Sequence, residues 1–196
     1  MIDRIRRVVH GTAVVTAAAV ALALAPAAVG ATRASGDPLG DENEKGAHCF
    51  IDKDDTLSPG VSIQPSSGTA ATPAPGIIEC HGKVNGFAPT GDGQVTEQAR
   101  YGTKDPDTCQ SGGEGDGKYD VTIPTSGGVQ KFIAIFTFTY GEPSTHGGVV
   151  AGHLKGDGFE GTFDITPKEG DCVTKPITRV HTVNDLRFEE SFFAHH

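Results

Sequence analysis

Short segments that are apolar, or that alternate apolar and polar residues, recur from residue 76 to the C-terminus between glycine-rich turns. Segments of this length bounded by turn residues are typical of β-strands. The chain offers no sustained helical period with end caps. The predicted strands are 77–84, 95–101, 119–123, 129–140, 148–154, 159–166 and 177–183, with 186–188 as an eighth candidate. The hydrophobic pattern therefore predicts an all-β fold.

The most apolar of these segments is 129–140. Successive side chains of a strand point to opposite faces of the sheet, which puts Phe132 and Phe136 on one face and Ile133 and Ile135 on the other. A strand that is apolar on both faces is expected where both faces are covered. We therefore predict that 129–140 is a central strand, with Phe136 in the core.

The segment 159–166 has a different pattern. Phe159, Phe163 and Ile165 share one face, and the residues between them are mainly polar. This alternation is typical of a sheet with one solvated face. The Asp157-Gly158 pair just before it favours a tight hairpin with the preceding strand, because such turns require positive φ angles.

Many short strands with regular turns predict two packed antiparallel sheets, a β-sandwich of the jelly-roll or Ig-like type. A closed β-barrel is the alternative, since both folds use the same strand pattern. We assign this domain to residues 76–196. Residues 32–75 are rich in Pro, Ser, Gly and acidic residues, which predicts a flexible N-terminal arm. Cys49 lies in a short apolar island of that arm and is expected to tether it to the domain by a disulfide.

Residues 1–31 have the layout of a secretory signal peptide. Three arginines precede an uncharged run rich in Ala, Val and Leu, and Val29-Gly30-Ala31 offers a cleavage site. The apolar run is short of the roughly 20 residues of a membrane span, so no membrane anchor is expected after cleavage. The Arg6-Arg7 pair leaves the choice between the general and twin-arginine export routes open. The sequence thus predicts a secreted, extracellular protein.

The four cysteines all follow this leader, at Cys49, Cys80, Cys109 and Cys172. An even number of cysteines in an exported chain predicts two disulfides, and the sequence leaves all three connectivities open. The closely spaced cysteine pairs of a structural zinc site are absent. We therefore expect the cysteines to be structural.

The formal net charge of the chain is −9 at pH 7. An acidic chain without a clustered basic face is not expected to bind nucleic acid, because it repels the phosphate backbone. The acidity also keeps a secreted protein soluble. The sequence therefore directs attention to an extracellular protein or glycan as partner.

Histidines within strands and aspartates in glycine-rich turns are the possible metal ligands of the chain. His153 and His181 each lie within a predicted strand and could approach one another as half of a zinc or copper site. Aspartates within the glycine-rich segments 91–93, 113–117 and 156–158 could hold calcium, although none fits the spacing of a calcium-binding loop. Turn chemistry explains these aspartates equally well. No metal or cofactor is expected.

Catalytic constellations are equally sparse. Glu160 and Asp164 share a strand face, and Glu97 or Asp120 could join them as the carboxylate pair of a glycosidase. Ser144 and His146 are close in sequence, but neither the G-x-S-x-G elbow nor a phosphate-binding loop is present. The sequence therefore favours a secreted non-catalytic binding or interaction protein, such as an inhibitor, effector or surface module. A small secreted hydrolase, either a glycosidase or a protease, is the alternative.

Overall fold

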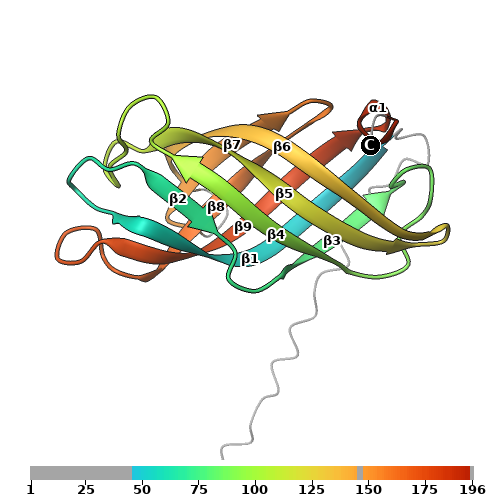
Figure 1. Cartoon of the computed structure of the whole chain (residues 1–196), viewed down its shortest axis with the longest axis horizontal. Helices are drawn as coiled ribbons and strands as arrows, with labels where there is room; N and C mark the ends of the chain where they lie inside the picture. Colours follow the sequence, from blue (N-terminus) through green and yellow to red (C-terminus); the bar gives the residue numbers. More distant parts are fainter. Residues whose placement is uncertain (1–45, 145–147, 195–196) are drawn as a thin grey trace, which may run out of the picture. The chain divides into compact units, whose positions relative to one another are not determined.

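The computed structural model describes residues 46–144 and 148–194, which belong to one compact unit. The predicted signal peptide 1–31 and residues 32–45 of the predicted arm lie outside the described residues. The described chain is almost entirely β-structure, as Figure 1 shows. Within this part of the chain, no helix is long and apolar enough to cross a membrane.

The described residues form nine antiparallel strands and one short helix. They are β1 (Gly46–Val61), β2 (Gly68–Ala71), β3 (Gly76–Gly82), β4 (Gly93–Tyr101), β5 (Gly113–Thr125), β6 (Gly128–Pro143), β7 (Val150–Gly156), β8 (Phe159–Glu169), β9 (Ile177–Glu189) and α1 (Glu190–Phe193). Each strand predicted from residue 76 onward is confirmed, and the eighth candidate is the second half of β9. The expected β7–β8 hairpin is also present, with Gly156 opposite Phe159.

The strands form a single sheet that closes on itself (Figure 1). Closure occurs where β1 pairs with β9 along most of its length. β2 and β3 occupy one position of the ring in succession, because both pair with β1 on one side and β4 on the other. The all-β, antiparallel prediction is confirmed, and its barrel alternative describes the arrangement better than two packed sheets. A barrel of about eight strands has an interior that side chains can fill or that can hold one small ligand.

The N-terminal boundary of the domain differs from the prediction. Residues 46–61 and 68–71 are not a flexible arm but strands of the barrel wall. The alternating pattern of β1 is real, since Cys49, Ile51, Lys53 and Asp55 are all buried. Lys53 and Asp55 are charged although they point inward, and for this reason the sequence does not show the alternation of β1 as a hydrophobic pattern.

β6 also differs from its predicted environment. Phe132 and Phe136 are buried in the barrel, whereas Ile133 and Ile135 are 44% and 69% exposed. The reason is topological: a closed sheet has one interior, so the second face of every strand turns outward. The prediction that both faces of this strand are covered is therefore wrong, although Phe136 does lie in the core.

Glycines inside the wall allow aromatic rings to pack closely against it. At Gly152 a Cβ atom would collide with the ring of Phe163, so a larger residue would force the ring or the wall to shift. The same relation holds between neighbouring strands for Gly115 and Phe138, Gly117 and Phe136, and Gly156 and Phe159. Glycine within a strand often marks such a close approach. These rings therefore contact the wall directly at the glycine positions.

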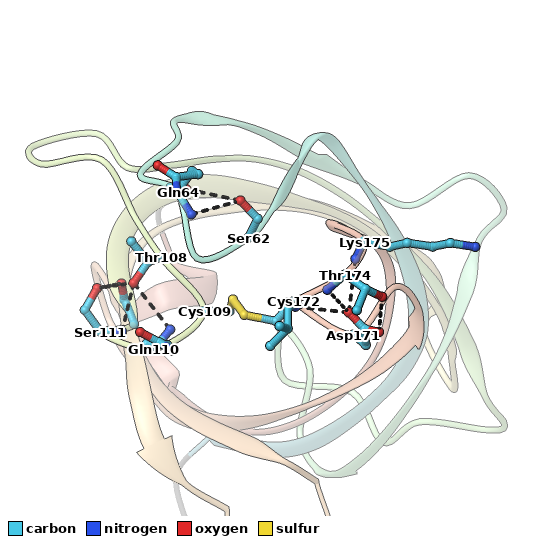
Figure 2. Close-up of a disulfide and its surroundings, with 12 residues drawn as sticks. Ser62, Gln64, Thr108, Cys109, Gln110, Ser111, Asp171, Cys172, Thr174 and Lys175 are labelled. Atoms are coloured by element: carbon cyan, nitrogen blue, oxygen red, sulfur yellow. Dashed lines mark hydrogen bonds between the residues drawn. A yellow bond between two sulfur atoms is a disulfide. The ribbon is translucent and has the colours of Figure 1, made fainter.

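The two disulfides are Cys49–Cys80 and Cys109–Cys172. The first joins directly opposed residues of β1 and β3 inside the barrel wall. The second joins the β4–β5 loop to the β8–β9 loop at one end of the barrel (Figure 2). No described cysteine is free. The prediction of two structural disulfides is confirmed, and the connectivity that the sequence left open is now assigned.

Candidate functional site

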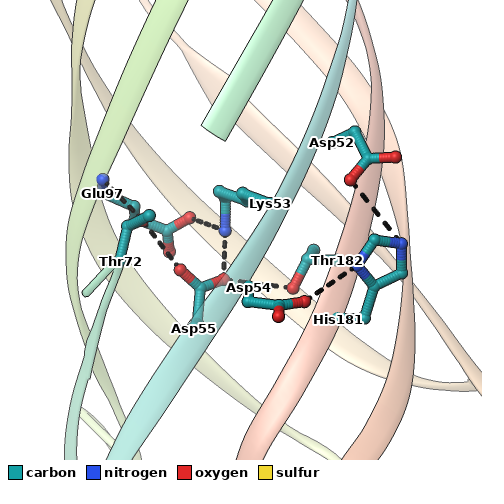
Figure 3. Close-up of polar contacts among 8 residues, drawn as sticks. All are labelled: Asp52, Lys53, Asp54, Asp55, Thr72, Glu97, His181 and Thr182. Carbon is teal, nitrogen blue, oxygen red and sulfur yellow. Dashed lines mark hydrogen bonds and ion pairs between the residues drawn. The ribbon is translucent and has the colours of Figure 1, made fainter. Parts of the chain in front are cut away.

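A polar cluster lies inside the barrel at mid-height, where Lys53 is bound by two carboxylates (Figure 3). Its Nζ atom contacts Oδ2 of Asp55 and lies 2.5 Å from Oε2 of Glu97. Thr182 donates to Oδ2 of Asp55 over 3.1 Å, and Thr72 donates to Oδ1 over 2.9 Å. All three charged residues are buried. Buried charges are tolerated in proteins when they are paired and hydrogen-bonded in this way.

The cluster lies beside a break in the barrel wall. β2 ends at Ala71 and β3 begins at Gly76, and the four residues between them include two prolines, which cannot donate to a sheet ladder. Thr72 closes part of this gap, because its hydroxyl accepts a hydrogen bond from the backbone N–H of Glu97 and donates to Asp55. The polar cluster thus stabilises the wall where the regular ladder is missing.

Burial raises the pKa of Glu97, because it disfavours the charged carboxylate more than the neighbouring Lys53 favours it. The pKa of Lys53 is also raised: burial lowers it, but the two carboxylates together outweigh that effect. The pKa of Tyr119 is well above its ordinary value, because its hydroxyl is buried and faces the carboxylate of Glu97. Perturbed groups of this kind can mark either a functional site or a structural ion-pair network.

Next to the cluster the barrel contains a cavity of about 140 Å³. Its walls are mainly aromatic and aliphatic, and three of the rings that pack on wall glycines, Phe136, Phe138 and Phe163, contribute to them. Leu154 and Val180 line it as well. Because those rings lie against the wall, the centre of this half of the barrel is left open.

Asn184 also borders this cavity. It follows Thr182 by two residues on β9 and shares its inward face. Its neighbours across the sheet are Ile51 on β1 and Phe163 on β8. The side chain is 1% exposed, and its Nδ2 atom has no hydrogen-bond partner among the described residues. Most buried polar atoms in proteins are hydrogen-bonded, so this amide requires an explanation.

Three loops are joined at the end of the barrel nearest the cavity (Figure 2). The Cys109–Cys172 disulfide links two of them, and Figure 2 shows it in front of the ring of strands. The β1–β2 loop joins both partners, since the N–H of Cys109 donates to Ser62 and the N–H of Ile63 donates to Cys172. Cys109 lines the cavity directly. This loop layer therefore forms the cover of the cavity.

Buried Asp107 anchors the same layer to the wall. It accepts hydrogen bonds from the hydroxyl of Tyr140 and from the backbone N–H of Gly102, each over 2.9 Å. On the β8–β9 loop, Asp171 accepts hydrogen bonds from the hydroxyl of Thr174 and from the three backbone N–H groups of Val173 to Lys175. These bonds, that of the Thr174 hydroxyl foremost, lower the pKa of Asp171 to about 2. The loops around the disulfide are thus fixed by their own hydrogen bonds.

The histidine pair is not assembled. His153 is exposed on β7 and lies opposite Thr162, whereas His181 on β9 lies opposite Thr166, four residues further along β8. His181 instead contacts Asp54, with 3.0 Å between Nδ1 and Oδ1. The aspartates of 91–93, 113–117 and 156–158 are not gathered either, and the described residues include no group of three potential metal ligands.

The predicted carboxylate set is divided by the barrel wall. Glu160 is on the outer surface of β8, and Asp164 and Asp120 also follow the outward phase of their strands. Glu97 points inward and joins Lys53 and Asp55. Of the Ser144–His146 pair, His146 lies outside the described residues. The sequence reading missed the inward Lys53 and Asp55, although their phase with Cys49 and Ile51 was a usable signal.

The fold and site define a small disulfide-linked β-barrel with an internal ion-pair cluster beside an apolar cavity. Comparisons of the chain with protein-family models, with curated proteins and with solved structures find no significant match.

Proposed function

We propose that this protein is a secreted binding protein that holds a small, mainly apolar molecule inside its barrel. The observation that carries this proposal is the cavity of about 140 Å³ beside the buried polar cluster. An apolar cavity of about 150 Å³ is large enough to admit benzene or xenon. Ligand sites in proteins combine apolar walls with a few polar groups that orient the ligand, which is the composition found here.

Export is the second part of the proposal. It is supported by the signal-peptide layout of residues 1–31 and by the two disulfides, which persist in oxidising compartments. Secreted binding of an extracellular partner was the function favoured by the sequence. The cavity supports a small molecule, rather than a protein or glycan, as the proposed partner.

Pairing within the cluster argues against the hydrolase alternative. A hydrolase of the carboxylate type needs one acid and one base that are free to reach substrate. Asp55 and Glu97 both bind Lys53, and Asp55 also accepts hydrogen bonds from two threonines. This arrangement favours a structural and orienting role over a catalytic one.

The proposal is tested by titrating the mature protein with methylenecyclohexane, an uncharged ring of suitable size, while recording amide NMR spectra. We expect saturable shifts that centre on Leu154, Phe163 and Val180, together with a higher melting temperature, because a ligand that binds only the folded state stabilises it. Absence of saturable shifts at these residues would contradict the proposal.

Two valines of β9 supply a matched pair of variants. Val180 lines the cavity, whereas Val183 is 41% exposed on the outer surface. Val180→Phe should fill the cavity and abolish binding, while Val183→Phe should leave binding unchanged. Equal effects of the two substitutions would mean that the probe binds elsewhere.

A further inference from the structure

Asn184 provides more specific information about the cavity ligand. Its side chain borders the cavity, is almost completely buried and has an Nδ2 group with no partner among the described residues. The χ2 torsion of asparagine is broad, so the amide can turn toward a bound molecule. This turn is needed, because the Nδ2 atom has almost no accessible surface in its described position. An N–H group can only donate, and therefore the ligand atom that would pair with it is a hydrogen-bond acceptor.

The charges around the cavity restrict the ligand further. Among the described residues that line it, Lys53 is the only cation, and both Asp55 and Glu97 already bind its ammonium group. Two carboxylates against one ammonium leave no net positive charge to attract an anion. A ligand cation would have to leave water for an apolar cavity whose carboxylates are already paired, which is unfavourable. The cavity is therefore suited to an uncharged ligand.

We propose that the cavity binds an uncharged, ring-sized molecule that carries a single strong acceptor, such as a carbonyl oxygen, and that Asn184 donates to this atom. This inference rests on the proposed function, since it names the class of ligand for the same cavity. The apolar part of the ligand contacts Leu154, Phe163 and Val180, and the acceptor lies toward Asn184. Asn184 is thus the residue that determines specificity for a carbonyl compound over a hydrocarbon.

Two probes separate this inference from the function on which it rests. Cyclohexanone and methylenecyclohexane have nearly the same shape and differ in the group on the ring, which is C=O in one and C=CH₂ in the other. The ratio of their affinities is measured in the wild-type protein and in Asn184→Leu, which removes the donor at similar side-chain size. We expect the preference for cyclohexanone to fall by about 2- to 12-fold in the variant, the effect of one hydrogen bond.

Val183→Leu, on the outer surface of the same strand, is the control and should retain the wild-type ratio. A second measurement needs no variant: the side-chain ¹⁵N–¹H signals of Asn184 in the wild-type protein should shift downfield with cyclohexanone and not with methylenecyclohexane. This measurement decides the question if Asn184→Leu does not fold.

The outcomes are distinct. If neither probe binds the wild-type protein, the proposed function fails. If both probes bind but the ratio and the Asn184 signals do not change, the function stands and the role of Asn184 is wrong. A long-lived water that stays on Asn184 in both complexes would likewise overturn the inference, because the amide would then have its partner without the ligand.

Discussion

The two halves of the barrel interior belong to the same closed sheet but are filled differently. The half that contains α1 is packed with rings: Phe188 lies within 5.0–5.9 Å, centroid to centroid, of Phe132, Phe159, Phe192 and Phe193. The half beneath the loop layer has its rings against the wall and a cavity of about 140 Å³ at its centre.

The difference follows from what closes each end of the barrel. The helix α1 inserts two phenylalanines into its end of the barrel, while the opposite end is covered by loops and a disulfide. The cluster of Lys53, Asp55 and Glu97 lies between the two halves. One half is therefore closely packed, and the other contains the cavity.

The packed half should be the more sensitive to loss of a ring. Phe188→Ala removes a buried side chain from the centre of the aromatic cluster and should lower the free energy of unfolding by about 3–5 kcal/mol. Ile135→Ala, at a residue that is 69% exposed on β6, is the control and should change it by less than about 0.5 kcal/mol. Chemical denaturation measures both values, and similar small effects would contradict the assignment of the core.

The buried polar cluster between the two halves can be tested by Lys53→Met. Removing the cation leaves Asp55 and Glu97 buried together, which should cost about 3–5 kcal/mol at neutral pH. Thr56→Ala, at an exposed position of β1, is the control, and its free energy of unfolding should be close to that of the wild-type protein. Chemical denaturation measures both variants. A neutral effect of Lys53→Met would mean that the cluster is solvated.

The stability that Lys53→Met loses relative to the wild-type protein should depend on pH and be larger at neutral than at acid pH. The pKa of Glu97 is already raised in the wild-type protein, and loss of Lys53 removes the charge that opposes the rise. A raised carboxyl pKa means that the folded state holds its proton more tightly than the unfolded state does. The contribution of Glu97 to the free energy of unfolding is therefore complete below about pH 4.5. It is lost as the pH rises through the pKa of the folded state. Lys53→Met should therefore approach wild-type stability in acid and diverge from it toward neutrality.

The wild-type protein should show the complementary behaviour in alkali. The pKa of Lys53 is raised above 10.5, so the contribution of Lys53 to the free energy of unfolding is complete below that pH. This contribution is lost as the pH rises through the pKa that Lys53 has in the folded state. The difference in unfolding free energy between wild type and Lys53→Met should consequently narrow at strongly alkaline pH.

The loop layer is expected to matter for access as well as for stability. Replacing Cys109 and Cys172 together by serine removes a link between residues 63 positions apart and should cost about 2–4 kcal/mol. Because this disulfide covers the cavity, exchange of methylenecyclohexane should also become faster. Line-shape NMR measures the exchange, and an unchanged rate would place the entrance elsewhere.

Overpacking distinguishes the halves most sharply. Val95 is 1% exposed in the packed core and does not line the cavity, whereas Val180 does. Val95→Phe should cost about 1–3 kcal/mol, since a packed core has no room for a ring. Val180→Phe should cost clearly less, because its ring has space to occupy. Equal losses in thermal or chemical denaturation would argue that the cavity is not open.

The hydrophobic pattern predicted the strands better than their arrangement. Alternation located β8 and the Asp157-Gly158 turn correctly, because both are set by local rules. It misplaced Ile133 and Ile135, because exposed apolar residues look the same in sequence whether a second sheet covers them or not. Sheet closure depends on the long-range pairing of β1 with β9, which no local pattern encodes.

The candidate site was harder to predict. Lys53 and Asp55 have the composition of a surface segment, and only their phase with Ile51 indicates that they point inward. Their stability in the interior depends on Glu97, Thr72 and Thr182, which come from distant parts of the chain. A buried ion-pair cluster is a property of the closed barrel, so it could be recognised only once the barrel was known.

The central claim is that the loop-side half of the barrel contains an accessible apolar cavity and the α1 half does not. Crystals of the protein under xenon pressure test this directly, since xenon enters apolar cavities and is located by its anomalous scattering. We expect one internal xenon site, bordered by Leu154, Phe163 and Val180. An empty loop-side half, or a xenon atom among Phe132, Phe188 and Phe192, would contradict the account.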